Sequence, residues 1–127
     1  MPRLLHCLGV HPNLIPVQGI DELDQLLSES ETRPLLVFKH SYTCGVSTEA
    51  LDELLSHLDA DSGQAARYAL VTVQTHRDVS NAVSTKLGIR HETPQALLVR
   101  DRQVVWAASH FRVTANAMLA AITAAAR

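Results

Sequence analysis

The chain has 127 residues, of which 46% are hydrophobic and 19% charged, and its formal net charge is −2. This length suits one domain, and the composition excludes a disordered or low-complexity chain. Aromatic residues make up only 4%, whereas a nucleic-acid binder would need a basic face and stacking rings. We therefore expect no nucleic-acid partner, and expect a small molecule or another protein instead.

The N-terminal sequence begins like a signal peptide, but His6, Gly9 and Pro12 interrupt its apolar stretch and no small-residue cleavage site follows. No apolar run approaches the roughly 18–20 residues that span a bilayer. The two cysteines, Cys7 and Cys44, are too few for a disulfide framework. We therefore expect a cytoplasmic protein with reduced thiols and no membrane partner.

The first half of the chain predicts a helix, a strand and a second helix. Residues 1–16 form an irregular lead-in interrupted by prolines, and residues 20–28 carry apolar residues at helical spacing. Residues 35–38 form a continuous apolar run, which is typical of a central strand covered on both faces. Residues 46–59 have one apolar helix face, and His57 is expected on the solvated side of that helix.

The second half predicts three more strands and two more helices. The strands are expected at residues 68–73, 95–99 and 103–107, with a loop over 89–93 and a tight turn at Asp101-Arg102. Asp78 is expected to cap a helix that ends at Gly88. Thr114 is expected to cap the final helix, which directs Met118, Leu119 and Ile122 inward.

This order of elements predicts the fold class. A β-α-β unit requires a parallel pair with a helical crossover, and the closing hairpin adds an antiparallel pair. An α/β fold with a four-stranded mixed sheet flanked by helices fits the order. This is the thioredoxin-like arrangement, expected as a single domain over residues 1–127.

Cys44 lies where the first strand ends and a helix begins. Helix N-termini carry partial positive charge and unpaired N–H groups, which stabilise a thiolate, the nucleophilic form of cysteine. His40, four residues earlier, is close enough in sequence to add positive charge when protonated. The alternative is that Cys44 is a small buried residue at the start of a helix.

Thr93-Pro94 favours the functional interpretation. A proline just before a strand cannot donate to the sheet ladder, so it belongs at the first residue of a strand or at an edge. In thioredoxin folds this peptide bond is cis and lies against the active-site cysteine, and X–Pro bonds are those for which the cis form costs little. The sequence therefore predicts a cis Thr93-Pro94 bond beside Cys44.

Three blocks, at residues 40–47 (HSYTCGVS), 88–95 (GIRHETPQ) and 105–111 (VWAASHF), resemble the monothiol bacilliredoxins. These are the bacillithiol-system redox-active proteins of the YtxJ family, a branch of thioredoxin-like proteins, and the resemblance runs from about residue 35 to 114. It implies a cytosolic enzyme that removes bacillithiol from protein mixed disulfides. It also implies Cys44 as nucleophile, bacillithiolated client proteins as partners, bacillithiol as thiol co-substrate and no bound cofactor.

Two positions close to Thr43 and Cys44 affect the redox chemistry expected of the Cys44 thiol. Gly45 replaces a proline that is usual in the family, which puts the redox potential in doubt because glycine loosens the first helical turn. Ser47 stands where a dithiol redoxin carries its resolving cysteine. A hydroxyl cannot form a disulfide, so Cys44 must act alone. The Ser47 hydroxyl is also expected to bond a backbone N–H.

The histidines raise the question of a metal. No pair among the seven has the i, i+4 spacing of a zinc helix, and we expect no native metal. His40 and His91 can face Cys44 from two sides and tune the thiolate or contact the ligand. Each can equally be a histidine hydrogen-bonded at a sheet edge. The role of His110, in the third block, stays open.

Bacillithiol carries carboxylates on its malate group, so a cation near the site would help to bind it. Lys39 and Arg90 lie closest in sequence to Cys44 and Pro94, although solvated surface charge is the simpler interpretation of both. Cys7 is a resolving thiol or, more simply, an apolar filler.

Two alternatives of other classes stay open. One is a non-catalytic module that binds a low-molecular-weight thiol, a metal or an iron–sulfur cluster through Cys44. The other is an adaptor domain with an inert Cys44.

Overall fold

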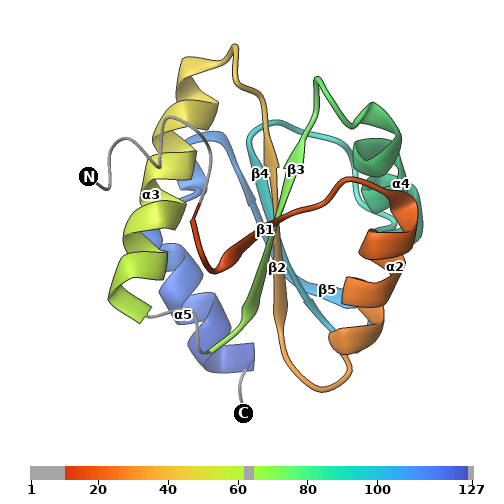
Figure 1. The fold of residues 1–127 in the computed structure, drawn as a ribbon. Coiled ribbons are helices and arrows are strands. Elements are labelled where there is room, and N and C mark those ends of the chain that lie inside the picture. The colour runs from red at the N-terminus through yellow and green to blue at the C-terminus, as the bar shows by residue number, and fades with distance from the viewer. Residues whose placement is uncertain (1–10, 62–64, 126–127) are drawn as a thin grey trace.

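The computed structural model describes residues 11–61 and 65–125, which form a mixed sheet with helices on both faces (Figure 1). The strands are β1 (Leu14–Pro16), β2 (Leu35–His40), β3 (Arg67–Thr72), β4 (Gln95–Arg100) and β5 (Gln103–Ser109). The helices are α2 (Ile20–Glu29), α3 (Gly45–Asp61), α4 (Arg77–Leu87) and α5 (Ala115–Ala125), with a short 3-10 helix, η1 (His110–Arg112). The predicted elements are present, each within two residues of its expected bounds.

The sheet has five strands in the order β1-β3-β2-β4-β5, not the four expected. The extra strand, β1, pairs in parallel with β3, so the prediction of an irregular lead-in is wrong for Leu14–Pro16. A three-residue strand is too short to show a period, and Pro16 is tolerated because it lies on an edge. Central β2 runs parallel to β3 and antiparallel to β4, and all six of its residues are buried.

The alternation of β2 divides the core into two layers. Leu36 and Phe38 face α3 and α5, whereas Leu35 and Val37 face α2 and α4. The helix pairs lie on opposite sides of the sheet in Figure 1. Because side chains of a strand alternate between faces, Lys39 lies on the α2 and α4 side, which decides its environment below.

The helix ends agree with the sequence in two cases and differ in one. Gly88 closes α4 with φ 64°, a left-handed conformation that glycine adopts at little cost. Thr114 Oγ1 accepts the N–H of Ala117 at 3.1 Å, which confirms it as a cap. His76, not Asp78, is the N-cap of α4, and Asp78 lies in its first turn, where a carboxylate still complements the helix dipole.

The final helix buries a narrower face than expected. Met118 and Ile122 are fully buried, but Leu119 is 49% exposed, so its predicted inward direction is wrong. Residues four apart share a helix face, whereas a neighbour in sequence is turned by about 100°. Only one stripe of α5 therefore packs on the sheet.

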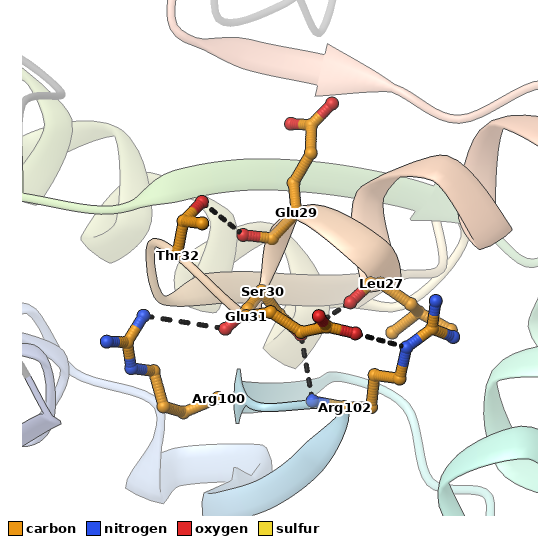
Figure 2. Close-up of polar contacts among 7 residues, drawn as sticks. All are labelled: Leu27, Glu29, Ser30, Glu31, Thr32, Arg100 and Arg102. Atoms are coloured by element: carbon orange, nitrogen blue, oxygen red, sulfur yellow. Dashed lines mark hydrogen bonds and ion pairs between the residues drawn. The ribbon is translucent and has the colours of Figure 1, made fainter.

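A hydrogen-bonded cluster around Ser30 holds the β4–β5 turn to the end of α2 (Figure 2). Buried Ser30 donates from Oγ to the carbonyl of Leu27 at 2.5 Å and accepts the N–H of Arg102 at 2.9 Å. Arg102 also pairs through Nε with Glu31 at 2.8 Å. Asp101 and Arg102 have φ of 53° and 64°, which confirms the tight turn. This cluster lies at the end of the sheet opposite to the β2–α3 junction.

None of the helices in the described ranges is both long enough and apolar enough to cross a bilayer.

Candidate thiol site at the start of α3

Cys44 directly precedes α3, which begins at Gly45. The carbonyl of Cys44 accepts the N–H of Thr48 at 3.1 Å, and its own N–H donates to the carbonyl of Ser41 at 3.2 Å, so it occupies the N-cap position. The side chain is partly exposed. The sequence placed Cys44 correctly, at a helix start where the dipole favours an anion.

The Thr93-Pro94 turn lies at the same end of the sheet. Lys39 pairs with Gln95 across β2 and β4, so the chain leaving β2 toward Cys44 passes the chain entering β4 through Pro94. The Thr93-Pro94 bond is cis, as the sequence predicted. The carbonyl of Pro94 accepts the N–H of His110 at 3.0 Å.

Thr93 presents an open backbone edge. Among the residues that the structure describes, its main-chain N–H and C=O make no hydrogen bond. Backbone groups that lack partners are a template for pairing with an extended chain. This turn, at the same end of the sheet as Cys44, can therefore bind the backbone of a peptide or a peptide-like thiol.

Ser47 anchors the loop that carries the thiol. Its side chain is fully buried, and Oγ accepts the N–H of Ser41 at 2.9 Å, as the sequence predicted for a backbone partner. Oγ also lies 2.8 Å from Nδ1 of His40. When the ring proton lies on Nε2, Nδ1 accepts the single hydroxyl proton of Ser47, while Oγ accepts the N–H of Ser41. Burial lowers the pKa of His40, and a hydrogen bond with the Ser47 backbone opposes that effect.

This arrangement assigns His40 to the support of the loop. Its ring stacks on Phe38 with the centroids 6.1 Å apart, and it reaches the loop through Ser47. The lowered pKa favours the neutral imidazole at neutral pH. The expected role of a protonated His40 that adds charge beside the thiol is therefore not what its environment favours.

Lys39 is fully buried, so its interpretation as a solvated surface charge or a ligand-binding cation is wrong. Its Nζ donates to Ser84 Oγ at 2.8 Å and to His91 Nδ1 at 3.1 Å. Burial lowers its pKa to about 8. Side chains of β2 alternate between the two faces of the sheet, and this alternation directs Lys39 under α4. Its closeness to Cys44 in sequence did not indicate this direction.

His91 continues the contact toward the cis-proline turn. Because Lys39 donates to Nδ1, the ring proton lies on Nε2 and is donated to Thr93 Oγ1 at 3.2 Å. Burial lowers the pKa of His91, the positive charges of Lys39 and Arg77 lower it further, and Glu92 opposes them. A chain of hydrogen bonds thus joins α4 to the residue before Pro94.

Gln74 is a site residue that sequence reasoning missed. Its Nε2 donates to Ser41 Oγ at 2.6 Å and to Thr43 Oγ1 at 3.2 Å, and Oε1 accepts the N–H of Tyr42 at 3.4 Å. Gln74 follows β3, the parallel neighbour of β2. Polar residues beyond the carboxyl ends of neighbouring parallel strands meet at one edge, which is the signal that could have found it. Thr43 therefore helps to hold the loop.

The remaining predicted residues lie around this end of the sheet. Arg90 is exposed and its carbonyl accepts Gln95 Nε2 at 3.0 Å. A Cβ at Gly45 would meet nothing within 4 Å, so the helix start is open there. His110 has φ 55° and lies 3.6 Å from Glu92 Oε1.

Two other predictions have different outcomes. His57 is buried, not solvated, and its Nε2 lies 2.7 Å from the hydroxyl of Tyr68, because α3 turns this position toward β3. Cys7 lies outside the described residues. Within the described part of the chain, no three His, Cys, Asp or Glu side chains gather as a candidate metal site.

Comparisons with known proteins agree with this geometry. Residues 15–118 match the family described as monothiol bacilliredoxin BrxC. The fold is similar to a solved structure described as a candidate oxidoreductase with a thioredoxin fold, at 28% identity and a TM-score of 0.76, over 86% of this chain and 93% of the other. It is also similar to a poplar thioredoxin h mutant, at 19% identity, a TM-score of 0.70 and coverage of 88% and 81%. A Halobacterium salinarum thioredoxin mutant matches at 21% identity, a TM-score of 0.68 and coverage of 93% and 96%.

Proposed function

Because the chain belongs to the monothiol bacilliredoxin family and has the thioredoxin fold of a thiol oxidoreductase, we propose that it removes bacillithiol from protein mixed disulfides through Cys44. Its partners are bacillithiolated client proteins and a second low-molecular-weight thiol, in a reducing cytoplasm. The observation that carries the proposal is the partly exposed thiol at the N-cap of α3, on the same sheet end as the cis Thr93-Pro94 turn.

The first step is a thiol–disulfide exchange. The Cys44 thiolate attacks the bacillithiol sulfur of the client's mixed disulfide, a new S–S bond forms and the old one breaks. The client cysteine leaves as a thiolate and takes a proton from solvent. The electron balance is closed, because one disulfide is exchanged for another, and Cys44 now carries bacillithiol.

The second step needs an external thiol. Position 47, where a resolving cysteine would stand, holds a serine whose hydroxyl is committed to Ser41 and His40. A second bacillithiol or another small thiol attacks the adduct, releases a low-molecular-weight disulfide and regenerates the Cys44 thiol. The free backbone edge of Thr93 supports the binding of the peptide-like part of the substrate.

The test incubates the protein with a bacillithiolated model protein and weighs the products by mass spectrometry. The wild type should strip the adduct and carry one bacillithiol on Cys44. Cys44→Ser should abolish the reaction, and Cys7→Ser should leave the first step unchanged. Removal of the adduct by Cys44→Ser, or a wild type that never carries bacillithiol, would contradict the proposal. A purified protein that holds a coloured cluster and exchanges no disulfide would favour the binding module.

A further inference from the structure

A second feature lies beside the cis-proline turn, a cavity of about 200 Å³ between the loop after α4 and strand β5. Its polar lining consists of Arg90, Glu92, Gln95, Ser109 and Arg112, and we call it the arginine pocket. Gln95 directly follows Pro94 and pairs with Ser109 across β4 and β5. The arginine pocket therefore opens at the end of the sheet where the thiol lies.

Gln95 brings an unused acceptor to this pocket. Its side chain is only 4% exposed, and its Nε2 donates to the carbonyl of Arg90 at 3.0 Å. Its Oε1 is buried and has no hydrogen-bond partner among the described residues. A buried acceptor without a partner costs free energy, and an O–H or N–H group of a ligand in the pocket would satisfy it.

Two cations border the same space. Arg90 and Arg112 are both exposed, and neither forms an ion pair with a residue that the structure describes. Guanidinium groups bind carboxylates through two parallel hydrogen bonds. Glu92 opposes an anion, but its carboxylate lies 3.6 Å from Nδ1 of His110. Two arginines against one carboxylate leave the pocket suited to an anion.

We propose that the arginine pocket binds the carboxylate-bearing end of the low-molecular-weight thiol, with Arg90 and Arg112 pairing its carboxylates and Gln95 Oε1 accepting one of its hydroxyl or amine protons. The inference rests on the proposed function for the identity of that thiol. Pockets for whole drug-sized ligands have about 300–1,000 Å³, so a cavity of this size accommodates one end of the molecule. The end of the molecule that carries the thiol then lies outside the pocket and extends toward Cys44.

The test uses malyl glucosamine, which is bacillithiol without its cysteine, because its binding needs no thiol chemistry. Titration into the isotope-labelled protein should shift the side-chain amide resonance of Gln95 and the backbone resonance of Ser109. Arg90→Gln and Arg112→Gln should each weaken binding by about tenfold. Arg102→Gln, the same charge change at the opposite end of the sheet, is the matched control and should bind as the wild type does.

Glucosamine without malate should bind weakly and equally to all variants. Equal affinity of malyl glucosamine for the wild type and both pocket variants would overturn the inference, and so would the absence of any shift at Gln95 with millimolar ligand. The two proposals fail separately. A wild type that binds malyl glucosamine but never carries bacillithiol contradicts only the exchange reaction. An Arg112→Gln variant that exchanges bacillithiol at the same rate as the wild type contradicts only the pocket.

Discussion

The Nζ atom of fully buried Lys39 lies 3.1 Å from Nδ1 of His91, so a lysine of the central strand sets the tautomer of a histidine in the loop before Pro94. Nε2 of His91 is consequently the donor, and it reaches Thr93 Oγ1 at 3.2 Å. Ser84 on α4 holds the other side of the ammonium group at 2.8 Å. The turn that presents the Thr93 backbone is thereby fastened to the interior of the protein.

Lys39 should make the protein more stable as the pH rises into the alkaline range. Its pKa falls from 10.5 to about 8 in the folded protein. Between these values the unfolded chain keeps a proton that the folded chain has released, so the free energy of unfolding increases with pH. The gain is on the order of 2 kcal/mol. Urea denaturation at several pH values from neutral to about pH 10 measures it.

The matched control for this experiment is the other lysine of the sequence, Lys86, whose ammonium group is partly exposed and pairs with Asp24 at 2.9 Å. Lys39→Met should abolish the alkaline rise, and Lys86→Met should keep it. Lys39→Met should also slow thiol exchange several-fold, because His91 loses the donor that orients it. A Lys39→Met variant with the same alkaline rise as the wild type would show that Lys39 is not its source.

His40 should make the protein less stable on the acid side. Burial lowers its pKa below the ordinary value of 6.5, so the unfolded chain binds a proton first as the pH falls, and stability is lost below that value. Protonation also turns Nδ1 into a donor, so the hydroxyl proton of Ser47 loses its acceptor there. His40→Asn keeps an acceptor for Ser47 but cannot titrate in this range.

The His40→Asn variant should therefore lose less stability than the wild type between about pH 7 and pH 5, as measured by urea denaturation. His91→Asn is the comparison, because burial and two nearby cations also lower the pKa of His91. Each single variant should remove part of the loss of unfolding free energy between about pH 7 and pH 5. The double variant should remove more of it than either single variant. An unchanged pH slope in His40→Asn would contradict the assigned protonation state.

Ser47→Cys should convert the monothiol site into a dithiol. Cys44 caps α3 and position 47 lies in its first turn, a separation that brings two Cα atoms within reach of a disulfide. In a Cys7→Ser background the variant should form an internal disulfide and release bacillithiol without an external thiol. Mass spectrometry with and without alkylation detects the loss of two free thiols.

Ser47→Ala is the control for that exchange. It removes the hydroxyl without adding a thiol, so the adduct should stay on Cys44 as in the wild type. It also leaves the Ser41 N–H without its buried acceptor, which should cost about 1–3 kcal/mol of stability. A Ser47→Cys variant that still accumulates bacillithiol on Cys44 would contradict the assignment of position 47 as the place of a resolving cysteine.

Ser30→Ala should destabilise the protein without affecting exchange. The substitution leaves the N–H of Arg102 without its acceptor, in the cluster of Figure 2, and should cost about 1–2 kcal/mol. Ser28→Ala, two residues earlier and exposed, should change stability little. Because Ser30 lies at the opposite end of the sheet from Cys44, the exchange rate should stay unchanged. A slower exchange in the folded variant would mean that the two ends are coupled.

The sequence by itself determined the elements and the place of the thiol. Apolar runs and helical spacing located β2 and α3, and their junction placed Cys44 at a helix N-terminus. These features depend on neighbours in the chain, so local patterns carry them. Gly88 and Thr114 were found as helix ends for the same reason, since a cap acts on residues within one turn.

Only the tertiary structure decided how the charged and polar residues are used. Lys39 looked like a surface cation next to a reactive loop, yet the alternation of a strand covered on both faces buries it under α4. His57 was expected in solvent and pairs instead with Tyr68 on a distant strand. Gln74 and Gln95 reach the site through strand neighbours separated by many residues in sequence. Burial and hydrogen-bond partners depend on which strands lie side by side, and no local pattern encodes that pairing.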